Sequence, residues 1–352
     1  MISEGLEARG SGVRGSSGSG LRAAQVVAAV TEDFAPPVAD VREFAADVRD
    51  GLSVVPKRLE PKYLYDDLGS ALFGAICRLP WYRITRAEKA LLSEHGAEVA
   101  GSFGRRVRLI ELGCGTGEKL QVLADRFSSC GNGAAVHLVD VSQLALDQTA
   151  NAIAGTGLPV MCHRATYEEG VLRAARGREP GEEMLVLFLG SNIGNSDPRA
   201  ALDLLRRIRR PLAAGDGLLL GVDLVKPESV LRLAYDDPLG ITAAFNRNLL
   251  VRMNRELGAD FDLSSFRHVA LWNGRESRVE MHLASTRRQN VCVRAAHLTA
   301  SFEVGETIWT ESSYKYEPGE IRSMASLCGF DVRAMWVDDD ARFALTMLKA
   351  AS

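Results

Sequence analysis

Several features that would identify other classes of protein are missing from this sequence. None of its apolar runs is long enough to span a bilayer, so we expect no membrane-embedded part. A net charge of −3 gives no general attraction to a phosphate backbone, which disfavours a nucleic-acid substrate. The six cysteines are dispersed without a CxxC pair, which argues against a metal centre and fits a reducing compartment. We therefore expect a cytoplasmic protein without metal, membrane or nucleic-acid partners, and we take it to be a monomer.

The composition that is present belongs to an ordinary globular protein, with 46% hydrophobic and 25% charged residues. A length of 352 residues exceeds one average domain and suggests one large domain or two coupled ones. Residues 1–21, with SGVRGSSGSG among them, are mostly small and polar, and we predict a disordered leader over residues 1–30. That polar stretch lacks the apolar core that a signal peptide would need.

One glycine-rich stretch organises the rest of the chain. An apolar strand is predicted over 107–112, a turn follows through Gly113, Gly115 and Gly117, and a helical pattern begins at Lys119. This strand–turn–helix order is that of the first βα unit in nucleotide-binding folds. Glycine allows positive φ there and lets the backbone approach a ligand closely. The GxGxG spacing differs from the GxGxxG of dinucleotide-binding enzymes.

Two acids narrow the interpretation of this loop. Glu111 stands just before it, and a second apolar strand, 136–140, ends in Asp140, 27 residues after Gly113. An acid at the end of the second strand can accept hydrogen bonds from both ribose hydroxyls of an adenosine. Loop and acids together favour the S-adenosylmethionine (SAM) methyltransferases. A glycine turn in an NAD or FAD protein, or in one without a ligand, is the alternative.

The predicted elements alternate as in a doubly wound sheet, which indicates an α/β fold. Strands are expected at 107–112, 136–140, 159–163, 184–189 and 218–224, with helices at 87–99, 119–127, 142–153 and 198–212. Thr85 and Glu88 have the spacing of a capping box at the start of helix 87–99. Over 225–300 the alternation breaks into an insertion, with helices at 229–237, 241–257 and 261–266 and strands at 279–285 and 290–295. A helix at 318–327 and a terminal antiparallel hairpin, 332–337 with 343–349, complete the sheet.

Sequence blocks along the chain identify a family. They are YLYDDLGS (63–70), LPWYRITRAE (79–88), ELGCGTGEK (111–119), FLGSNIGN (188–195), DLVK (223–226), VEMHL (279–283) and WTESSYKY (309–316). In this order, over residues 35–350, they closely resemble the histidine Nα-methyltransferases of ergothioneine biosynthesis. The resemblance implies an enzyme that trimethylates the α-amine of L-histidine with three molecules of SAM, giving hercynine. It also implies a Rossmann-like SAM methyltransferase domain (87–224 and 316–352) and a second, α+β substrate-binding domain (31–86 and 225–315).

The resemblance also implies the roles of individual residues. A tyrosine near the substrate amine and an asparagine at its head group would be the catalytic residues, Tyr65 and Asn195. The imidazole would be held by Glu311 and Ser313, and the other substrate contacts would come from Tyr82, Gly190, Asn195, Tyr235 and Met281. The cofactor-binding set would be Glu111, Gly113, Gly115, Lys119, Asp140, Thr166 and Tyr167. Glu311 and Ser313 are one strand period apart, so their side chains are expected on one face.

Two departures and two alternatives accompany the resemblance. Gly117 stands where the family usually has serine and Thr166 where it usually has aspartate, which would alter cofactor contacts without touching the imidazole pocket. An Nα-methyltransferase of tryptophan or tyrosine is one alternative, although an acid facing the ring favours imidazole over indole. A catalytically inactive SAM-binding regulator is the other, and intact Lys119, Asp140 and Asn195 argue against it.

Overall fold

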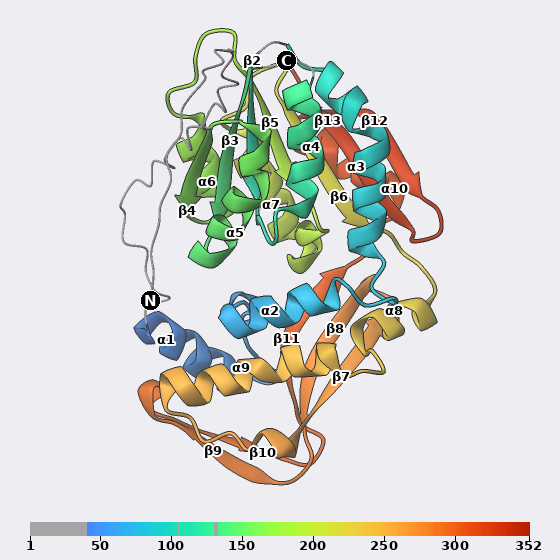
Figure 1. Cartoon of the computed structure of the whole chain (residues 1–352). Coiled ribbons are helices and arrows are strands. Elements are labelled where there is room, and N and C mark those ends of the chain that lie inside the picture. The colour runs from blue at the N-terminus through green and yellow to red at the C-terminus, as the bar shows by residue number, and fades with distance from the viewer. Residues whose placement is uncertain (1–40, 105, 130–132) are drawn as a thin grey trace, which may run out of the picture.

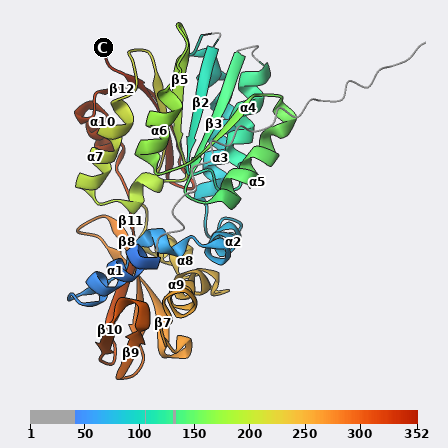
Figure 2. The same cartoon turned by 90° about the vertical axis from the view of Figure 1, so that its left-hand side faces the viewer.

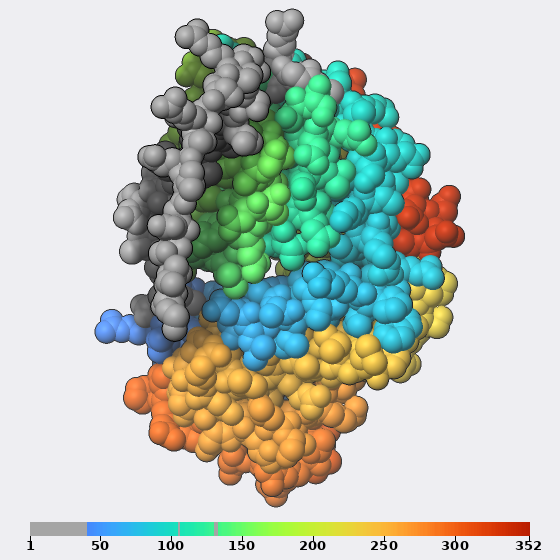
Figure 3. Space-filling model, viewed as in Figure 1, coloured from blue at the N-terminus to red at the C-terminus, as the bar shows by residue number. Residues whose placement is uncertain are grey.

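The computed structural model describes residues 41–104, 106–129 and 133–352, so the leader predicted at 1–30 lies outside the described residues. Figure 1 shows two stacked bodies, an upper one around a large sheet and a lower one around a smaller sheet. In the space-filling view of Figure 3 the blue segment that carries helix α2 lies between the green helices of the upper body and the orange helix α9. The two bodies are therefore in direct contact.

The upper body is built on a seven-stranded sheet with the order β12-β13-β6-β5-β2-β3-β4. Five strands are parallel: β2 (Arg106–Leu112), β3 (Gly133–Asp140), β4 (Val160–Arg164), β5 (Glu183–Phe188) and β6 (Gly217–Asp223). The last two, β12 (Phe330–Asp338) and β13 (Phe343–Ala350), form an antiparallel hairpin that pairs with β6. This topology confirms the predicted Rossmann-like α/β class and its terminal hairpin.

Helices cover both faces of this sheet, as Figures 1 and 2 show. One face carries α3 (Ile84–Gly101), α4 (Glu118–Ser129) and α5 (Gln143–Ile153), and the other carries α6 (Tyr167–Ala175), α7 (Pro198–Arg209) and α10 (Pro318–Leu327). Successive side chains of a strand point to opposite faces, so Leu109 packs with the first helix layer and Ile110 with the second. Burial on both sides explains why β5 is apolar from Met184 to Phe188.

The lower body joins segments from both ends of the chain. Its four-stranded sheet has the order β1-β11-β8-β7, with bounds β1 (Lys57–Arg58), β7 (Phe266–Asn273), β8 (Arg278–Ser285) and β11 (Thr307–Tyr314). A two-stranded ribbon, β9 (Gln289–Val293) and β10 (Leu298–Phe302), extends below it. The helices are α1 (Val41–Leu52), α2 (Asp67–Ile76), α8 (Glu228–Tyr235) and α9 (Ile241–Leu257), with a short 3₁₀ turn, η1 (Pro61–Leu64). Because β1 pairs with β11, the N-terminal segment and the insertion fold together.

Two local predictions are wrong. The segment predicted as a helix at 261–266 contains only the 3₁₀ turn η4 (Leu263–Ser265), and β7 begins at Phe266 because it pairs along its whole length with β8. The capping box is also absent: α3 begins at Ile84, and its N-cap is Arg83 without a side-chain hydrogen bond. Glu88 is instead fully buried and bonds outside its own helix. In both cases tertiary contacts override a local pattern.

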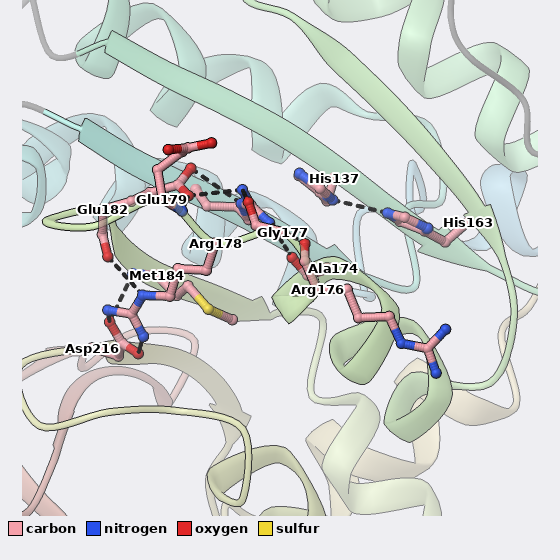
Figure 4. A network of polar contacts seen from close by, with 11 residues as sticks. His137, His163, Ala174, Arg176, Gly177, Arg178, Glu179, Glu182, Met184 and Asp216 are labelled. Atoms are coloured by element: carbon pink, nitrogen blue, oxygen red, sulfur yellow. Dashed lines mark hydrogen bonds and ion pairs between the residues drawn. The ribbon is translucent and has the colours of Figure 1, made fainter.

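A polar network, drawn in Figure 4, ties the amino-terminal ends of the parallel strands together. Asp216, which precedes β6, accepts hydrogen bonds from both terminal nitrogens of Arg178 at 2.6 and 2.8 Å. It also accepts from the backbone N–H of Met184 at 2.9 Å and of Ala213 at 2.8 Å. The network lies at the end of the sheet away from the glycine-rich loop, so its role is structural.

Candidate active site

A pocket lies between the two bodies, where the loops after the parallel strands meet the lower sheet. Open α/β sheets bind ligands at this carboxyl end of their strands. Every residue predicted to contact the substrate lines this one pocket: Tyr65, Tyr82, Gly190, Asn195, Tyr235, Met281, Glu311 and Ser313. Residues far apart in the chain, from η1 through to β11, therefore converge on one space.

The loop after β5 forms the upper wall. Gly190 has φ +78°, and the next residue, Ser191, is left-handed at φ +59°, a conformation that costs energy for any residue but glycine. The Ser191 hydroxyl holds the backbone N–H of Asp223 at 2.9 Å and so stabilises the bend. The 3₁₀ turn η3 (Asn192–Asn195) follows and brings Asn192 and Asn195 to the pocket. Ser191 and Asn192 were not predicted as site residues, although both stand inside the FLGSNIGN block.

Strand β11 supplies the polar floor. Glu311 and Ser313 are both buried, and both face the pocket. Met281 on β8 pairs directly with Glu311, so the two side chains lie together on one face of the sheet. Burial raises the pKa of Glu311 to about 7, although Lys315 and the hydroxyl of Tyr65, 3.4 Å away, act against the shift. The floor therefore carries a carboxyl group that titrates near neutrality.

Aromatic rings form the side walls. Tyr65 makes edge contacts with Phe73 and Phe245, whose ring centroids lie 5.6 and 5.5 Å from its own. Tyr82 packs edge-on against Tyr235 at 6.3 Å. Burial and the neighbouring carboxyl of Glu311 raise the pKa of Tyr65, so its hydroxyl stays neutral. Such a pocket offers π faces to a cationic nitrogen and neutral hydroxyls to polar groups.

A buried lysine, Lys315, lies against the hydroxyls of two pocket residues. Lys315 donates to the hydroxyls of Tyr235 at 2.8 Å and Ser313 at 2.7 Å, and forms an ion pair with Asp223 at 3.0 Å. Tyr235 and Ser313 are themselves hydrogen-bonded at 2.8 Å. No pattern in the sequence singled out Lys315 beyond its place in the WTESSYKY block.

The glycine-rich loop lies on the other side of the β5 loop, and its three glycines, Gly113, Gly115 and Gly117, all have positive φ. Asp140 fixes the loop, because its carboxylate accepts from the backbone N–H of Cys114 at 2.9 Å and of Ser142 at 2.8 Å. The first bond ties Asp140 to the glycine-rich loop and the second to the N-cap of α5, so this carboxylate holds the loop against the end of β3.

Neighbouring side chains pack closely around Gly113. A Cβ atom on Gly113 would lie 3.2 Å from the hydroxyl of Tyr167 and 3.0 Å from the side-chain amide of Asn192. Thr166 precedes Tyr167 as the N-cap of α6, without a side-chain cap bond. A Cβ on Gly117 would lie 3.0 Å from Cα of Thr149, so glycine suits the close approach of α5 in this chain.

A fully buried carboxylate, Glu88, links the first turn of α4 to the loop after β5. It accepts from the backbone N–H of Gly190 at 2.8 and 2.9 Å and from Nζ of Lys119 at 2.8 Å. Burial raises the pKa of Glu111 to about 8, although Lys119 counteracts it. One carboxyl oxygen of Glu111 is buried without a hydrogen-bond partner among the described residues. A buried Glu111 oxygen without a partner, next to the glycine-rich loop, fits a ligand with a polar, cationic part, as the methionine end of SAM has.

Comparison with known proteins decides the family. Residues 44–350 match the profile of the histidine-specific, SAM-dependent methyltransferases. The chain belongs to this family. Histidine N-alpha-methyltransferases from Mycobacterium tuberculosis and Mycolicibacterium smegmatis are 42% and 40% identical, each match covering 86% of this chain and 93% of the relative. Ergothioneine biosynthesis protein 1 of Schizosaccharomyces pombe is 27% identical, over 76% of this chain and 35% of its own length.

Membership makes this protein a SAM-dependent methyltransferase, with SAM as its co-substrate. Within the part of the chain that the structure describes, no group of His, Cys, Asp and Glu side chains is arranged to hold a metal ion. No helix among the same residues is long and apolar enough to cross a bilayer.

Proposed function

We propose that this methyltransferase acts on the α-amine of L-histidine and trimethylates it to hercynine, within ergothioneine biosynthesis. The observation that carries the proposal is the pairing of a buried carboxyl group, Glu311, with a hydroxyl, Ser313, on the pocket floor. A carboxylate accepts from one imidazole nitrogen while a hydroxyl serves the other, a match that indole does not offer. The two mycobacterial relatives support the substrate, and the S. pombe relative supports the pathway.

The proposed pose places each end of histidine against a different wall. The imidazole lies on Glu311 and Ser313, with Met281 beside it. Tyr82, Tyr235, Asn195 and the backbone at Gly190 hold the amino-acid head group, and Tyr65 lies near the amine. On the cofactor side we assign the loop glycines Gly113 and Gly115, with Glu111, Lys119, Asp140, Thr166 and Tyr167. The bridge from Lys119 through Glu88 to Gly190 would keep the two ligands in register.

The chemistry asks for positioning more than for a strong base. SAM supplies a methyl carbon bonded to a sulfonium, and the amine lone pair forms the new N–C bond as the C–S bond breaks. An amine held in line gains most of its rate from proximity and orientation. The neutral Tyr65 hydroxyl orients the nitrogen, and the amine proton leaves to water or a nearby carboxylate. The aromatic walls then favour the growing positive charge on nitrogen.

Two further assignments complete the proposal. We assign residues 31–86 and 225–315 to the substrate-binding domain, and 87–224 with 316–352 to the methyltransferase domain. The pairing of β1 with β11 supports the first grouping, and the continuous seven-stranded sheet supports the second. We also assign the protein to the cytoplasm as a monomer that acts on a small molecule; the free cysteines among the described residues support the reducing compartment.

One experiment tests the function directly. The purified full chain is incubated with SAM and each amino acid separately, and the products are weighed by mass spectrometry. We expect histidine to gain three methyl groups and tryptophan, tyrosine and phenylalanine to react far more slowly. Faster methylation of tryptophan or tyrosine would contradict the substrate. Tight SAM binding without methylation of any amino acid would favour a regulator.

A further inference from the structure

The Lys315 ammonium has one partner for each of its N–H groups. Its ammonium has three N–H donors and no acceptor, and three partners surround it: Asp223, Tyr235 and Ser313. Its side chain is fully buried. Burial works against its charge, but Tyr235 and Asp223 raise the pKa of Lys315 above its usual value. Lys315 is therefore a permanent donor that faces two pocket hydroxyls.

The two hydroxyls then have little freedom. A hydroxyl has one proton and two lone pairs. Ser313 accepts from Lys315 at 2.7 Å and from Tyr235 at 2.8 Å, which uses both of its lone pairs. Its own proton has no role in this cluster and is left for the pocket. Tyr235, which donates to Ser313 and accepts from Lys315, keeps one lone pair, so Ser313 is the hydroxyl of the pair that can donate to the pocket.

We propose that Lys315 is a positioning residue for ring recognition: with Tyr235 it fills both lone pairs of Ser313 and makes this hydroxyl a hydrogen-bond donor, so that the site selects the neutral imidazole of histidine. The ring nitrogen that faces Ser313 must then carry a lone pair, while the other nitrogen donates its N–H to Glu311. A protonated ring has N–H groups on both sides, and the one facing Ser313 would meet another donor. This inference rests on the proposed histidine substrate.

Other titratable and charged groups surround the cluster, and each variant below leaves all of them but the mutated residue in place. They are Asp223 and Lys226 at the end of β6, Glu311 on β11, Tyr65 after η1, and Tyr82 and Cys77 before α3. Lys226 provides a matched control. Its side chain is 7% exposed and pairs with Asp223 at 2.5 Å, as Lys315 does at 3.0 Å, but its other bond goes to the backbone carbonyl of Ala341. Only Lys315 reaches the two hydroxyls.

The first test compares Lys315→Met with Lys226→Met. Histidine kcat/KM is measured at saturating SAM from about pH 6 to 9, a range that spans the ring pKa of about 6.5. We expect Lys315→Met to lose at least tenfold in kcat/KM at pH 8, mainly through KM, with unchanged SAM affinity. Its activity should also fall less steeply toward acid, because hydroxyls released from Lys315 can accept from a protonated ring. Lys226→Met should stay within about threefold of the parent, with the parent's pH profile.

A second measurement uses the unaltered protein and so does not depend on a variant that folds. β-(1,2,4-Triazol-3-yl)alanine has the same amino-acid head group and a ring with one N–H and a facing acceptor nitrogen, but its ring stays unprotonated across this range. We expect it to be methylated. On the acid side, the slope of log kcat/KM against pH should be smaller by one for the triazole than for histidine, because the triazole ring has no proton to lose.

Equal slopes for the two substrates, or no methylation of the triazole, would overturn the role of Ser313 as a donor held by Lys315. So would a Lys315→Met variant that matches Lys226→Met in both kcat/KM and pH profile. Failure of the unaltered protein to methylate histidine at all would instead refute the proposed function, so the two failures are distinguishable.

Discussion

We expect Glu311 on the pocket floor to lower the free energy of unfolding when it is ionised. Burial raises the pKa of this carboxyl to about 7, from an ordinary value of 4.5. Each pKa unit corresponds to about 1.4 kcal/mol, so ionising Glu311 in the folded protein costs on the order of 3 kcal/mol. The group is protonated in both states below about pH 4.5, where the cost vanishes, and the cost is complete above about pH 7.

Replacing Glu311 by glutamine removes this titration while it keeps the side chain's size. We therefore expect Glu311→Gln to unfold at a higher temperature than the parent at pH 8, and at nearly the same temperature at pH 4.5 or below. Calorimetric unfolding of both proteins across this range measures the difference. Histidine binding should weaken in the same variant, because a charged acceptor is replaced by a neutral one.

Glu88→Gln is the matched control, since Glu88 is also buried but its carboxylate accepts from Gly190 and Lys119. In the glutamine variant one accepting oxygen becomes an NH2 group, which cannot accept the hydrogen bonds that the carboxylate accepted. This variant should therefore lose stability at pH 8. A Glu311→Gln variant that is less stable than the parent at pH 8, or whose difference from the parent does not grow with pH, would refute the reasoning.

Four further predictions follow from the site and the sheet. Asp140→Ala should weaken SAM binding at least tenfold in calorimetry, since a charge-assisted hydrogen bond contributes about 1.5–3 kcal/mol and this carboxylate also holds the loop at Cys114; unchanged affinity would remove it from the cofactor site. Tyr65→Phe should lower kcat more than it raises KM, and full turnover with a raised KM would make Tyr65 a binding residue only. Glu311→Ala should lower histidine kcat/KM by about 5- to 150-fold, the equivalent of an unpaired buried group at about 1–3 kcal/mol, and improve the relative use of tryptophan; an unchanged preference for histidine would argue against it. Asp216→Ala should destabilise the protein by about 3–5 kcal/mol, because it removes the acceptor of both terminal nitrogens of Arg178 and of two backbone N–H groups, while the Kd for SAM of the folded variant stays that of the parent.

The sequence by itself determined the features that depend on short stretches of chain. An apolar run such as Met184–Phe188 has few alternatives to a central strand, because it must be buried on both faces. Glycines at Gly113, Gly115 and Gly117 were expected to allow positive φ, and all three adopt it. The family blocks then named the pocket residues, which the structure brings together in one cavity.

The tertiary structure alone decided the rest. The segment from Phe266 is a strand because β8 lies beside it, and no local pattern encodes that partner. Glu88 has the spacing of a helix cap, but its side chain is buried and hydrogen-bonded to Gly190 and Lys119. These partners lie 102 and 31 residues away in the chain. Lys315 acquires its partners only when β11 packs against α8 and the end of β6. Local propensities amount to fractions of a kcal/mol per residue, whereas pairing or stranding a buried charge involves several, so the long-range contacts prevail at these positions.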